Sequence, residues 1–370
     1  MHKHLYLRAM THSLSADRFF DGECWQTGTI SISNGVIESV DSITPPDKHY
    51  EGCFIAPAFI DIQIYGAYGK LLAVYPDADA LYKLCNYCTS GGATLFLPTV
   101  ATNSPAVFKQ CINAVRDYWA EGGKGVWGLH LEGPWINPAK RGAHVDSFIH
   151  SPNVEEVEEL LEYGKGIIKM ITLAPEVCST EVVNMVRSYD IVISAGHSDA
   201  TFAEATAAFN SGIPAATHLY NAMSPLQHRA PGLVGACLLH PTAKASIIAD
   251  GYHVDFEAIR LAKKLMGERL FIITDAVTDT IEGPYQHSLV GGDRYECNGV
   301  LSGSAMTMHS SLVNLVKKAG ISIEEALRMC SLYPAEVIGA HKKIGRIAPQ
   351  YTAQFVVLDN DLQLVEVITS

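Results

Sequence analysis

Apolar runs and helical patterns alternate through the middle of the chain. Eight short, largely apolar runs occupy residues 58–62, 94–97, 126–130, 167–173, 191–194, 215–218, 245–249 and 270–274. Helical patterns lie between most of them, for example at residues 155–163, 179–188, 201–211 and 255–266. Apolar strands that alternate with helices are typical of a parallel sheet covered on both faces. The pattern predicts an α/β fold built on a (β/α)8 TIM-like barrel, whose active site lies at the carboxyl ends of the strands.

The two ends of the chain carry a strand pattern of a different kind. Residues 28–33 and 36–40 alternate between apolar and polar positions around Asn34-Gly35, which is a strong hairpin signal. A second pair of short strands is predicted close to the carboxyl terminus. Because short sheets with exposed edges need partners, we expect both ends to join. The sequence thus predicts a small β-sandwich from residues 1–56 plus 346–370, with a barrel domain at 57–345 inserted between them.

Composition and charge narrow the possible functions. The 370 residues are 48% hydrophobic and 18% charged, which is typical of a folded protein with a large core. The balance of 39 acidic against 27 basic residues gives a formal net charge of −12. Such a charge disfavours binding to nucleic acids, so none is expected as a partner. Positive contacts to an anionic substrate would have to be local.

The cysteines and the N-terminus indicate a cytoplasmic protein. Nine cysteines are scattered, and Cys85 with Cys88 forms the only CxxC pair, on a predicted helix. Without a second pair, buried thiols are the better interpretation than a zinc or redox motif. Residues 1–8 lack the apolar run of a signal peptide, and no segment approaches the roughly 20 apolar residues needed to cross a membrane. We therefore expect a reducing compartment and no membrane association.

Metal-ligand side chains occur where predicted barrel strands end. Glu132 follows one apolar run, His197 follows another, and His218 ends a third. A single histidine of this kind is more often a hydrogen-bonded core residue, but the carboxyl ends of barrel strands all meet at one face. Two imidazoles and a carboxylate suit one divalent metal ion with a position left open for water. Zn²⁺ is the first expectation, and Fe²⁺, Co²⁺ and Mn²⁺ accept the same ligands.

A further carboxylate completes a plausible reaction centre. Asp275 follows the last predicted strand, at residues 270–274, in the same kind of setting as Glu132. A carboxylate placed there can accept the proton of an attacking water and return it to the leaving group. The residues therefore predict a metal-dependent hydrolase.

Several longer stretches resemble the amidohydrolase superfamily, and within it the deacetylases that act on phosphorylated amino sugars. They are residues 57–61, 130–138, 142–144, 195–200, 217–226, 229–232, 248–253, 274–276 and 301–304, which follow the family's order. The resemblance implies hydrolysis of N-acetyl-D-glucosamine 6-phosphate to D-glucosamine 6-phosphate and acetate by a metal-activated water. It also implies one metal ion held by Glu132, His197 and His218, with Asp275 as the general base and acid.

The same resemblance suggests which residues bind the substrate. His144 would contact it near the carbonyl, although residues 140–144 taken alone have the character of an exposed loop. The other implied contacts are Ala143, Asn221, Ala222, Arg229, Asp250, His253, Leu301, Ser302 and Gly303. Arg229 has the planar fork that suits phosphate, and by resemblance it reaches the ligand of a neighbouring subunit, so a homodimer is expected. His228 is interpreted as an exposed loop residue, and no role is assigned to His240, His287, His309 and His341.

One departure from the superfamily pattern bears on the metal. Most members carry His-x-His after the first strand, whereas this chain has Gln63-Ile64-Tyr65. A second metal site is therefore not expected, and Gln63 is a candidate to hydrogen-bond the reactive water or to approach the metal. Tyr65 is expected to pack against the mouth of the barrel.

Two alternatives stay open. The fold could serve hydrolysis of another amide or cyclic amide, or the chain could be a metal-free scaffold, which the missing His-x-His allows.

Overall fold

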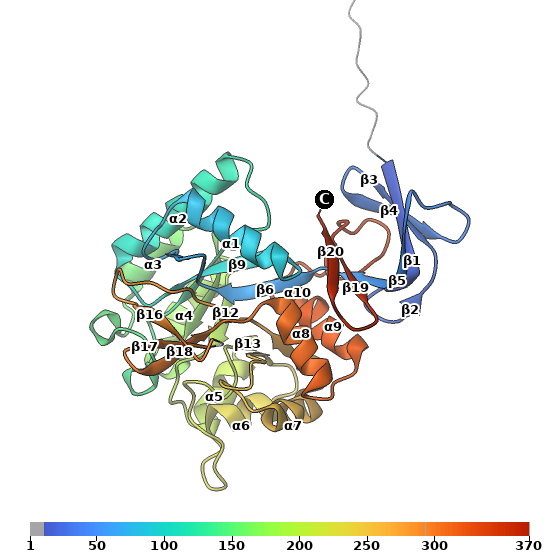
Figure 1. The fold of residues 1–370 in the computed structure, drawn as a ribbon. Coiled ribbons are helices and arrows are strands. Elements are labelled where there is room, and N and C mark those ends of the chain that lie inside the picture. Colours follow the sequence, from blue (N-terminus) through green and yellow to red (C-terminus); the bar gives the residue numbers. More distant parts are fainter. Residues whose placement is uncertain (1–10, 293, 370) are drawn as a thin grey trace, which may run out of the picture.

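A computed structural model of the protein describes residues 11–292 and 294–369. Residues 1–8, on which the expectation about a signal peptide depends, lie outside the described residues. The described chain forms a barrel surrounded by helices, with a smaller sheet packed at one side (Figure 1). None of the helices in the described ranges is long and apolar enough to span a membrane.

Eight parallel strands form the barrel, as the sequence predicts. Their spatial order is β15-β14-β13-β12-β11-β10-β9-β6. The strands are β6 (Phe59–Ile64), β9 (Ala93–Ala101), β10 (Leu129–Glu132), β11 (Ile168–Leu173), β12 (Val192–Ala195), β13 (Ala215–Ala216), β14 (Lys244–Ile247) and β15 (Leu270–Ile272). The first strand meets the segment after the last one, because Tyr65 N donates to Ala276 O over 2.9 Å and Asp275 N donates to Gln63 O over 3.0 Å. These bonds close the sheet on itself.

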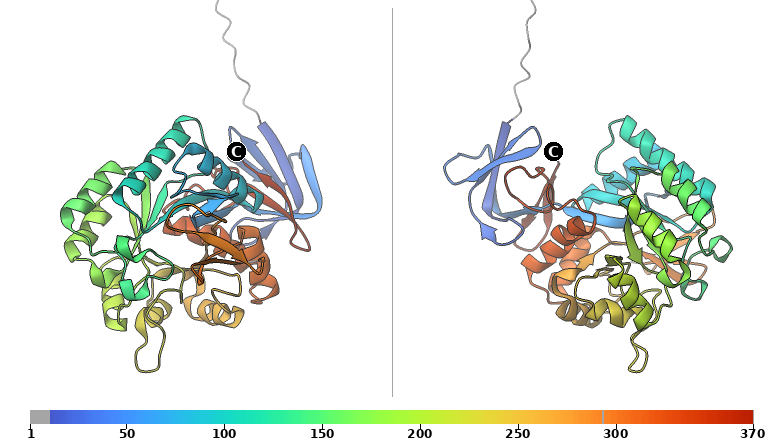
Figure 2. Two further views of the ribbon diagram at one scale, coloured as in Figure 1. Left: turned by 60° about the vertical axis from the view of Figure 1, so that its left-hand side comes forward. Right: turned by 180° about the vertical axis from the view of Figure 1, so that it is seen from behind.

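Helices surround the barrel on its outside, as two further views show (Figure 2). They are α1 (Ala78–Ser90), α2 (Pro105–Ala120), α3 (Val154–Tyr163), α4 (Thr180–Ser188), α5 (Phe202–Asn210), α6 (Gly232–Leu239), α7 (Phe256–Met266), α8 (Met308–Lys317), α9 (Ile323–Cys330) and α10 (Leu332–Val337). Four short 3-10 turns are η1 (Pro138–Lys140), η2 (Asp146–Phe148), η3 (Pro175–Val177) and η4 (Gly267–Arg269). Side-chain caps explain several starts: Ser179 caps α4, Thr201 caps α5 and Asp255 caps α7.

Both chain ends contribute to one small sheet. Its order is β20-β19-β5-β1-β3-β4, with β2 beside β1. The strands are β1 (Thr11–Phe20), β2 (Trp25–Gln26), β3 (Thr29–Ser33), β4 (Val36–Asp41), β5 (Lys48–Pro57), β19 (Phe355–Asp359) and β20 (Leu364–Ile368). The predicted turn joins β3 to β4, and Asn34 and Gly35 adopt φ values of 50° and 75°. Antiparallel pairing of β5 with β19 unites the two ends, so the prediction that they join is confirmed.

Two small antiparallel units that the sequence analysis missed lie near the mouth of the barrel. One is a hairpin of β7 (Gly66–Ala67) and β8 (Lys70–Leu71), directly after β6. The other is a three-stranded sheet of β16 (His287–Val290), β17 (Arg294–Cys297) and β18 (Val300–Ser304), between β15 and α8. These strands are too short, and their polarity is too mixed, to produce a clear period-2 pattern.

The thiols behave as predicted. All nine cysteines are free, and of the CxxC pair Cys88 is buried while Cys85 is half-buried on α1. The interpretation as structural thiols therefore agrees with the structure.

Candidate metal centre and active site

Four predicted functional residues lie at the carboxyl ends of four barrel strands, β10, β12, β13 and β15. Glu132 is the last residue of β10, whereas His197, His218 and Asp275 lie just beyond β12, β13 and β15. Those three have φ values of 47°, 39° and 54°, a left-handed conformation that side-chain-bearing residues rarely adopt. Such strain costs on the order of 1–3 kcal/mol per residue and persists where the surrounding structure imposes it, most often at functional sites.

Glu132, His197 and His218 converge on one point. His218 Nε2 lies 3.1 Å from Glu132 Oε1, His197 Nε2 lies 3.3 Å from the same oxygen, and the two nitrogens are 3.1 Å apart. Atoms held about 2.0–2.1 Å from a tetrahedral centre would lie about 3.3 Å from each other. The three side chains therefore have a separation that fits a shared divalent cation.

The backbone orients one ligand for that purpose. His197 Nδ1 lies 2.9 Å from the carbonyl oxygen of Lys140. Because a carbonyl only accepts, Nδ1 carries a proton, which leaves Nε2 as the ring nitrogen available to a metal ion. His218 differs, since its Nδ1 is buried and finds no hydrogen-bond partner among the described residues. A ring with an unpaired buried nitrogen is held in place mainly by what binds its other nitrogen.

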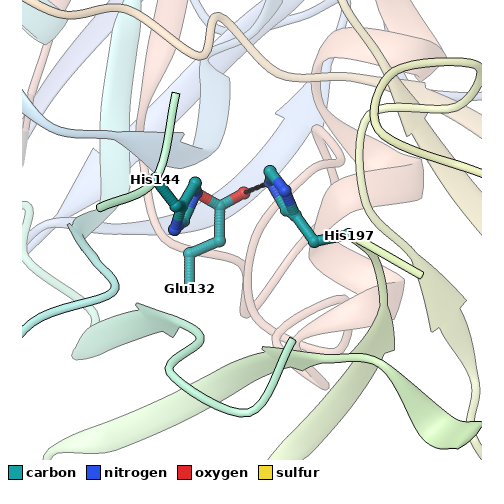
Figure 3. A group of neighbouring side chains, drawn as sticks. All are labelled: Glu132, His144 and His197. Carbon is teal, nitrogen blue, oxygen red and sulfur yellow. Dashed lines mark hydrogen bonds and ion pairs between the residues drawn. The ribbon is translucent and has the colours of Figure 1, made fainter. Parts of the chain in front are cut away.

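His144 lies on the opposite side of the Glu132 carboxylate, as Figure 3 shows. Its Nε2 is 3.0 Å from Glu132 Oε2, and its Nδ1 is 2.7 Å from Thr102 Oγ1. The impression of an exposed loop is wrong for this residue, because His144 is only 5% exposed while Arg141 and Gly142 are exposed. Contacts with residues distant in sequence pull the end of the loop inward. Glu132, His144 and His197 form a second compact group able to hold a metal ion.

Gln63 connects the carboxylates at the centre. Its Nε2 lies 2.9 Å from Glu132 Oε1 and 2.7 Å from Asp275 Oδ1. Tyr65 donates its hydroxyl proton to Glu132 Oε2 over 2.6 Å. Tyr65 thus packs at the mouth as expected, and it also contacts the carboxylate directly. Neutral donors occupy the positions at which most superfamily members carry two histidines.

Burial and close charges shift the ionisation of this cluster. Although burial opposes it, the neighbouring His197 charge and the bonds from His144 and His218 hold the pKa of Glu132 well below its ordinary value. Burial, together with repulsion from His197, lowers the pKa of His144 to about 4. Burial, reinforced by the charge of Glu132, raises the pKa of Asp275 to about 6. At neutral pH the centre therefore holds two buried carboxylates beside a neutral His144, an environment that favours a cation.

A cavity opens over the centre, and both apolar and polar side chains line it. A mostly apolar lining with a few polar groups is typical of small-molecule sites. Of the residues predicted from the resemblance, the cavity is lined by Glu132, Ala143, His144, His197, His218, Asn221, Ala222, His253, Asp275, Leu301 and Ser302. These residues come from segments spread over much of the chain, and the fold brings them together.

Three predicted substrate contacts do not line the cavity. Asp250 lies behind His253 and accepts from its Nδ1 over 2.6 Å, so it orients the ring that faces the cavity. Gly303 is buried next to Val277. Arg229 is exposed, in the loop between β13 and α6 that projects from the barrel in Figure 1. For Arg229 a contact within this chain's cavity is thus not observed.

The structure adds cavity residues that sequence reasoning missed. His287, the first residue of β16, and Tyr285, two residues before that strand, line the cavity, and their rings stack nearly in parallel with centroids 6.4 Å apart. His287 Nδ1 lies 2.9 Å from Ser302 Oγ. Nothing in the local pattern distinguished these residues. Thr102 also escaped notice, although it follows strand β9 just as Asp275 follows β15 and could have been found by the same rule.

Comparison with known proteins agrees with these observations. The model of the amidohydrolase family matches residues 54–369. An N-acetylgalactosamine-6-phosphate deacetylase of Escherichia coli O157:H7 is 30% identical over 97% of this chain and 98% of that protein. An N-acetylglucosamine-6-phosphate deacetylase of Haemophilus influenzae is 32% identical over 86% of each chain. The crystal structure of N-acetylglucosamine-6-phosphate deacetylase from Pasteurella multocida has a TM-score of 0.91 at 30% identity, covering 97% of this chain and 98% of that one.

Proposed function

The chain belongs to the amidohydrolase family and is a hydrolase, and from that premise we propose that it removes acetate from N-acetyl-D-glucosamine 6-phosphate. The observation that carries the proposal is the buried trio of Glu132, His197 and His218 with Asp275 near it, all four lining one cavity. The names of the relatives, which include deacetylases of N-acetylhexosamine 6-phosphates over nearly the whole chain, support this substrate class.

One divalent metal ion is proposed as the cofactor, held by Glu132, His197 and His218. Zn²⁺ remains the first expectation, with Fe²⁺, Co²⁺ and Mn²⁺ as alternatives. When bound, such an ion supplies Lewis-acid chemistry, which stabilises negative charge on a water molecule and on a carbonyl oxygen. The 3.1–3.3 Å separations of the three ligand atoms support this assignment.

Asp275 is proposed to move the proton. Its carboxylate lies at the mouth of the barrel, lines the cavity and is oriented by Gln63. With a pKa raised to about 6 by burial, it is ionised at neutral pH yet basic enough to accept a proton. It takes the proton from the attacking water and delivers it to the nitrogen of the departing amine.

His144 is proposed to assist the carbonyl. Because burial lowers its pKa to about 4, the ring is neutral at pH 7 and donates one N–H without carrying a charge. A neutral donor near the carbonyl oxygen stabilises the negative charge that develops there during attack. Release of the bond to Glu132 would free His144 Nε2 for this task.

The sugar phosphate is proposed to lie against Asn221, Ala222 and His253. Asp250 accepts the Nδ1 proton of His253, which directs the other ring nitrogen away from Asp250. Ala143, Leu301, Ser302 and Gly303 are proposed as further contacts. Arg229 lies on the projecting loop and is proposed to reach the phosphate bound by a second copy, which makes the functional unit a homodimer.

Acetate release tests the proposal directly. The purified protein is assayed with N-acetylglucosamine 6-phosphate and with unphosphorylated N-acetylglucosamine, before and after a chelator, with metal content measured on the same samples. We expect turnover of the phosphorylated sugar, loss of at least 10³-fold after metal removal, and recovery on adding Zn²⁺. Equal rates on the unphosphorylated sugar would indicate another amide hydrolase, and a metal-free protein without rescue would indicate a scaffold.

The galacto epimer is a second candidate substrate. A relative that matches 97% of this chain is named for N-acetylgalactosamine 6-phosphate. The two sugars differ in the orientation of one hydroxyl group. The same assay with both epimers decides between them, since a ratio of kcat/KM above tenfold identifies the preferred one.

Two organisational proposals accompany the function. We propose that residues 1–56 with 346–370, and residues 57–345, are the two domains of the chain, because one sheet unites both ends. We also propose a cytoplasmic location, which the nine free thiols support because such thiols persist in reducing compartments.

A further inference from the structure

The cavity has two unlike walls. One is apolar and is formed by Tyr65, Leu71, Ala73, Ala101, Val277 and Tyr285. Four of these residues, Tyr65, Leu71, Val277 and Tyr285, belong to one buried cluster that is separate from the barrel core. Most of this wall comes from the β7–β8 hairpin with its flanking residues and from the chain that follows Asp275, and Ala101 at the end of β9 completes it.

The apolar wall adjoins the reacting centre on the side of Glu132 Oε2. Tyr65 bonds to that oxygen over 2.6 Å. The ring of Tyr285 meets the ring of His144 edge-on, with centroids 6.3 Å apart, and His144 contacts the same oxygen. Val277 lies two residues beyond Asp275. Tyr65, Tyr285 and Val277 are thus each linked to a group at the reacting centre, and Leu71 packs with them in the same cluster.

A polar part of the lining adjoins His218. Asn221 N donates to His218 O over 2.9 Å, and His253 faces the cavity from its contact with Asp250. An N-acyl sugar phosphate has a single apolar end, the acyl group, and several polar ones. Apolar surface is transferred favourably from water only to an apolar environment, so the two walls fix which way the substrate lies.

We propose that Tyr65, Leu71, Val277 and Tyr285 form an acyl subsite that receives the methyl group of the substrate and limits the length of the acyl chain. The inference rests on the proposed function and adds the residues that select the group removed. Leu71 is 3% exposed and Val277 is 6% exposed, with Val74 and Tyr295 packed behind them. Protein interiors packed in this way yield little room to an additional methylene group.

A series of N-acyl substrates tests the subsite. N-formyl, N-acetyl, N-propionyl and N-butyryl glucosamine 6-phosphate are compared by kcat/KM on the metal-loaded enzyme. With the unmodified chain we expect at least a tenfold decrease from acetyl to propionyl. In Leu71→Ala and Val277→Ala, the ratio of propionyl to acetyl is expected to rise at least tenfold, because each change opens room beside the methyl group.

Val74→Ala is the matched control. Val74 packs on the same apolar cluster but is not among the residues that line the cavity. The substitution Val74→Ala therefore removes the same atoms as Val277→Ala without widening the subsite. Its ratio of propionyl to acetyl should stay within twofold of the unmodified chain. A ratio is insensitive to the fraction of folded enzyme, so partial misfolding of a variant does not imitate the effect.

The outcomes separate this inference from the proposed function. If the unmodified chain hydrolyses none of the four substrates, the proposed function fails. If it hydrolyses the acetyl substrate but Leu71→Ala and Val277→Ala shift the ratio no further than Val74→Ala, the acyl subsite is refuted while the function stands. The subsite is equally refuted if the unmodified chain accepts acetyl and butyryl groups alike.

Discussion

In the β3–β4 hairpin of the terminal sheet, positive φ values fall on Asn34 and Gly35, two residue types that adopt them readily. At the barrel mouth, positive φ values fall on His197, His218 and Asp275, which adopt them at a cost. In the hairpin, the residue types fit the left-handed backbone conformation. At the mouth, the surrounding fold imposes that conformation on histidine and aspartate residues whose side chains form the site.

The interiors of the two regions differ in the same way. The core of the terminal sheet is apolar and includes fully buried Ile30 and Phe355. The interior of the mouth buries Glu132 and Asp275 within hydrogen-bond distance of histidine or glutamine. Buried charges are expensive unless they are paired, so they contribute little to stability. The apolar core of the terminal sheet therefore stabilises the fold, whereas the buried charges at the mouth lower stability and provide reactive groups.

Replacement of Asp275 should have the largest effect on activity without lowering stability. In Asp275→Asn the proton acceptor is lost, and kcat is expected to fall about 10²–10⁴-fold. Stability should not fall, because a carboxyl group whose pKa is raised by burial is one that the fold would hold more easily without its charge. Steady-state kinetics and thermal unfolding of the metal-free proteins measure both. A variant with near-normal kcat, or with a markedly lower Tm, would contradict this division of roles.

A core substitution in the terminal sheet should instead lower the free energy of unfolding and leave kcat unchanged. Phe355 is fully buried at the pairing of β19 with β5, and Phe355→Ala is expected to cost about 3–5 kcal/mol of unfolding free energy. The kcat per folded molecule should stay unchanged, as chemical denaturation and active-site titration would reveal. Val365→Ala is the control, because Val365 in β20 is 52% exposed and its change should cost less than about 0.5 kcal/mol.

The pH dependence of kcat tests the role of Asp275 at the mouth. Burial raises the pKa of Asp275 to about 6, and only the ionised form accepts a proton. The kcat is therefore expected to fall about tenfold per pH unit below pH 6. A bound cation favours the carboxylate and moves this limb lower, so pH 6 is its upper bound. A pH–rate profile of the metal-loaded enzyme checks this, and a midpoint well above 6 would argue against Asp275 as the base.

The smallest effect is expected at the hairpin turn. Gly35 has a φ of 75°, and in Gly35→Ala the added Cβ should cost about 1 kcal/mol through the left-handed conformation. Denaturant midpoints measure the loss, and kcat should not change. A loss of activity at constant stability would indicate that the terminal sheet influences the mouth, which the comparison does not anticipate.

Much of the scaffold could be read from the chain because its signals are local. Apolar runs predict strands, and cap residues such as Ser179 and Thr201 predict helix starts, from residues only a few positions apart in the sequence. Part of the site could be predicted from the sequence as well. Because the carboxyl ends of barrel strands share one face, Glu132, His197 and His218 could be expected to lie close together. The β7–β8 hairpin and His287 could not be found, since their short, mixed strands carry no periodic signal, and Tyr285 lies in a segment without regular structure.

The sequence alone determined the barrel, the joining of the two ends, the likeness to amidohydrolases and the set of ligand-type residues. Only the tertiary structure decided that His144 is buried against Glu132, that Asp250 contacts His253, and that one cavity has both an apolar and a polar part to its lining. The reason is physical. Backbone pattern depends on nearest neighbours along the chain, whereas burial, direction and charge environment depend on residues that closure of the barrel brings together.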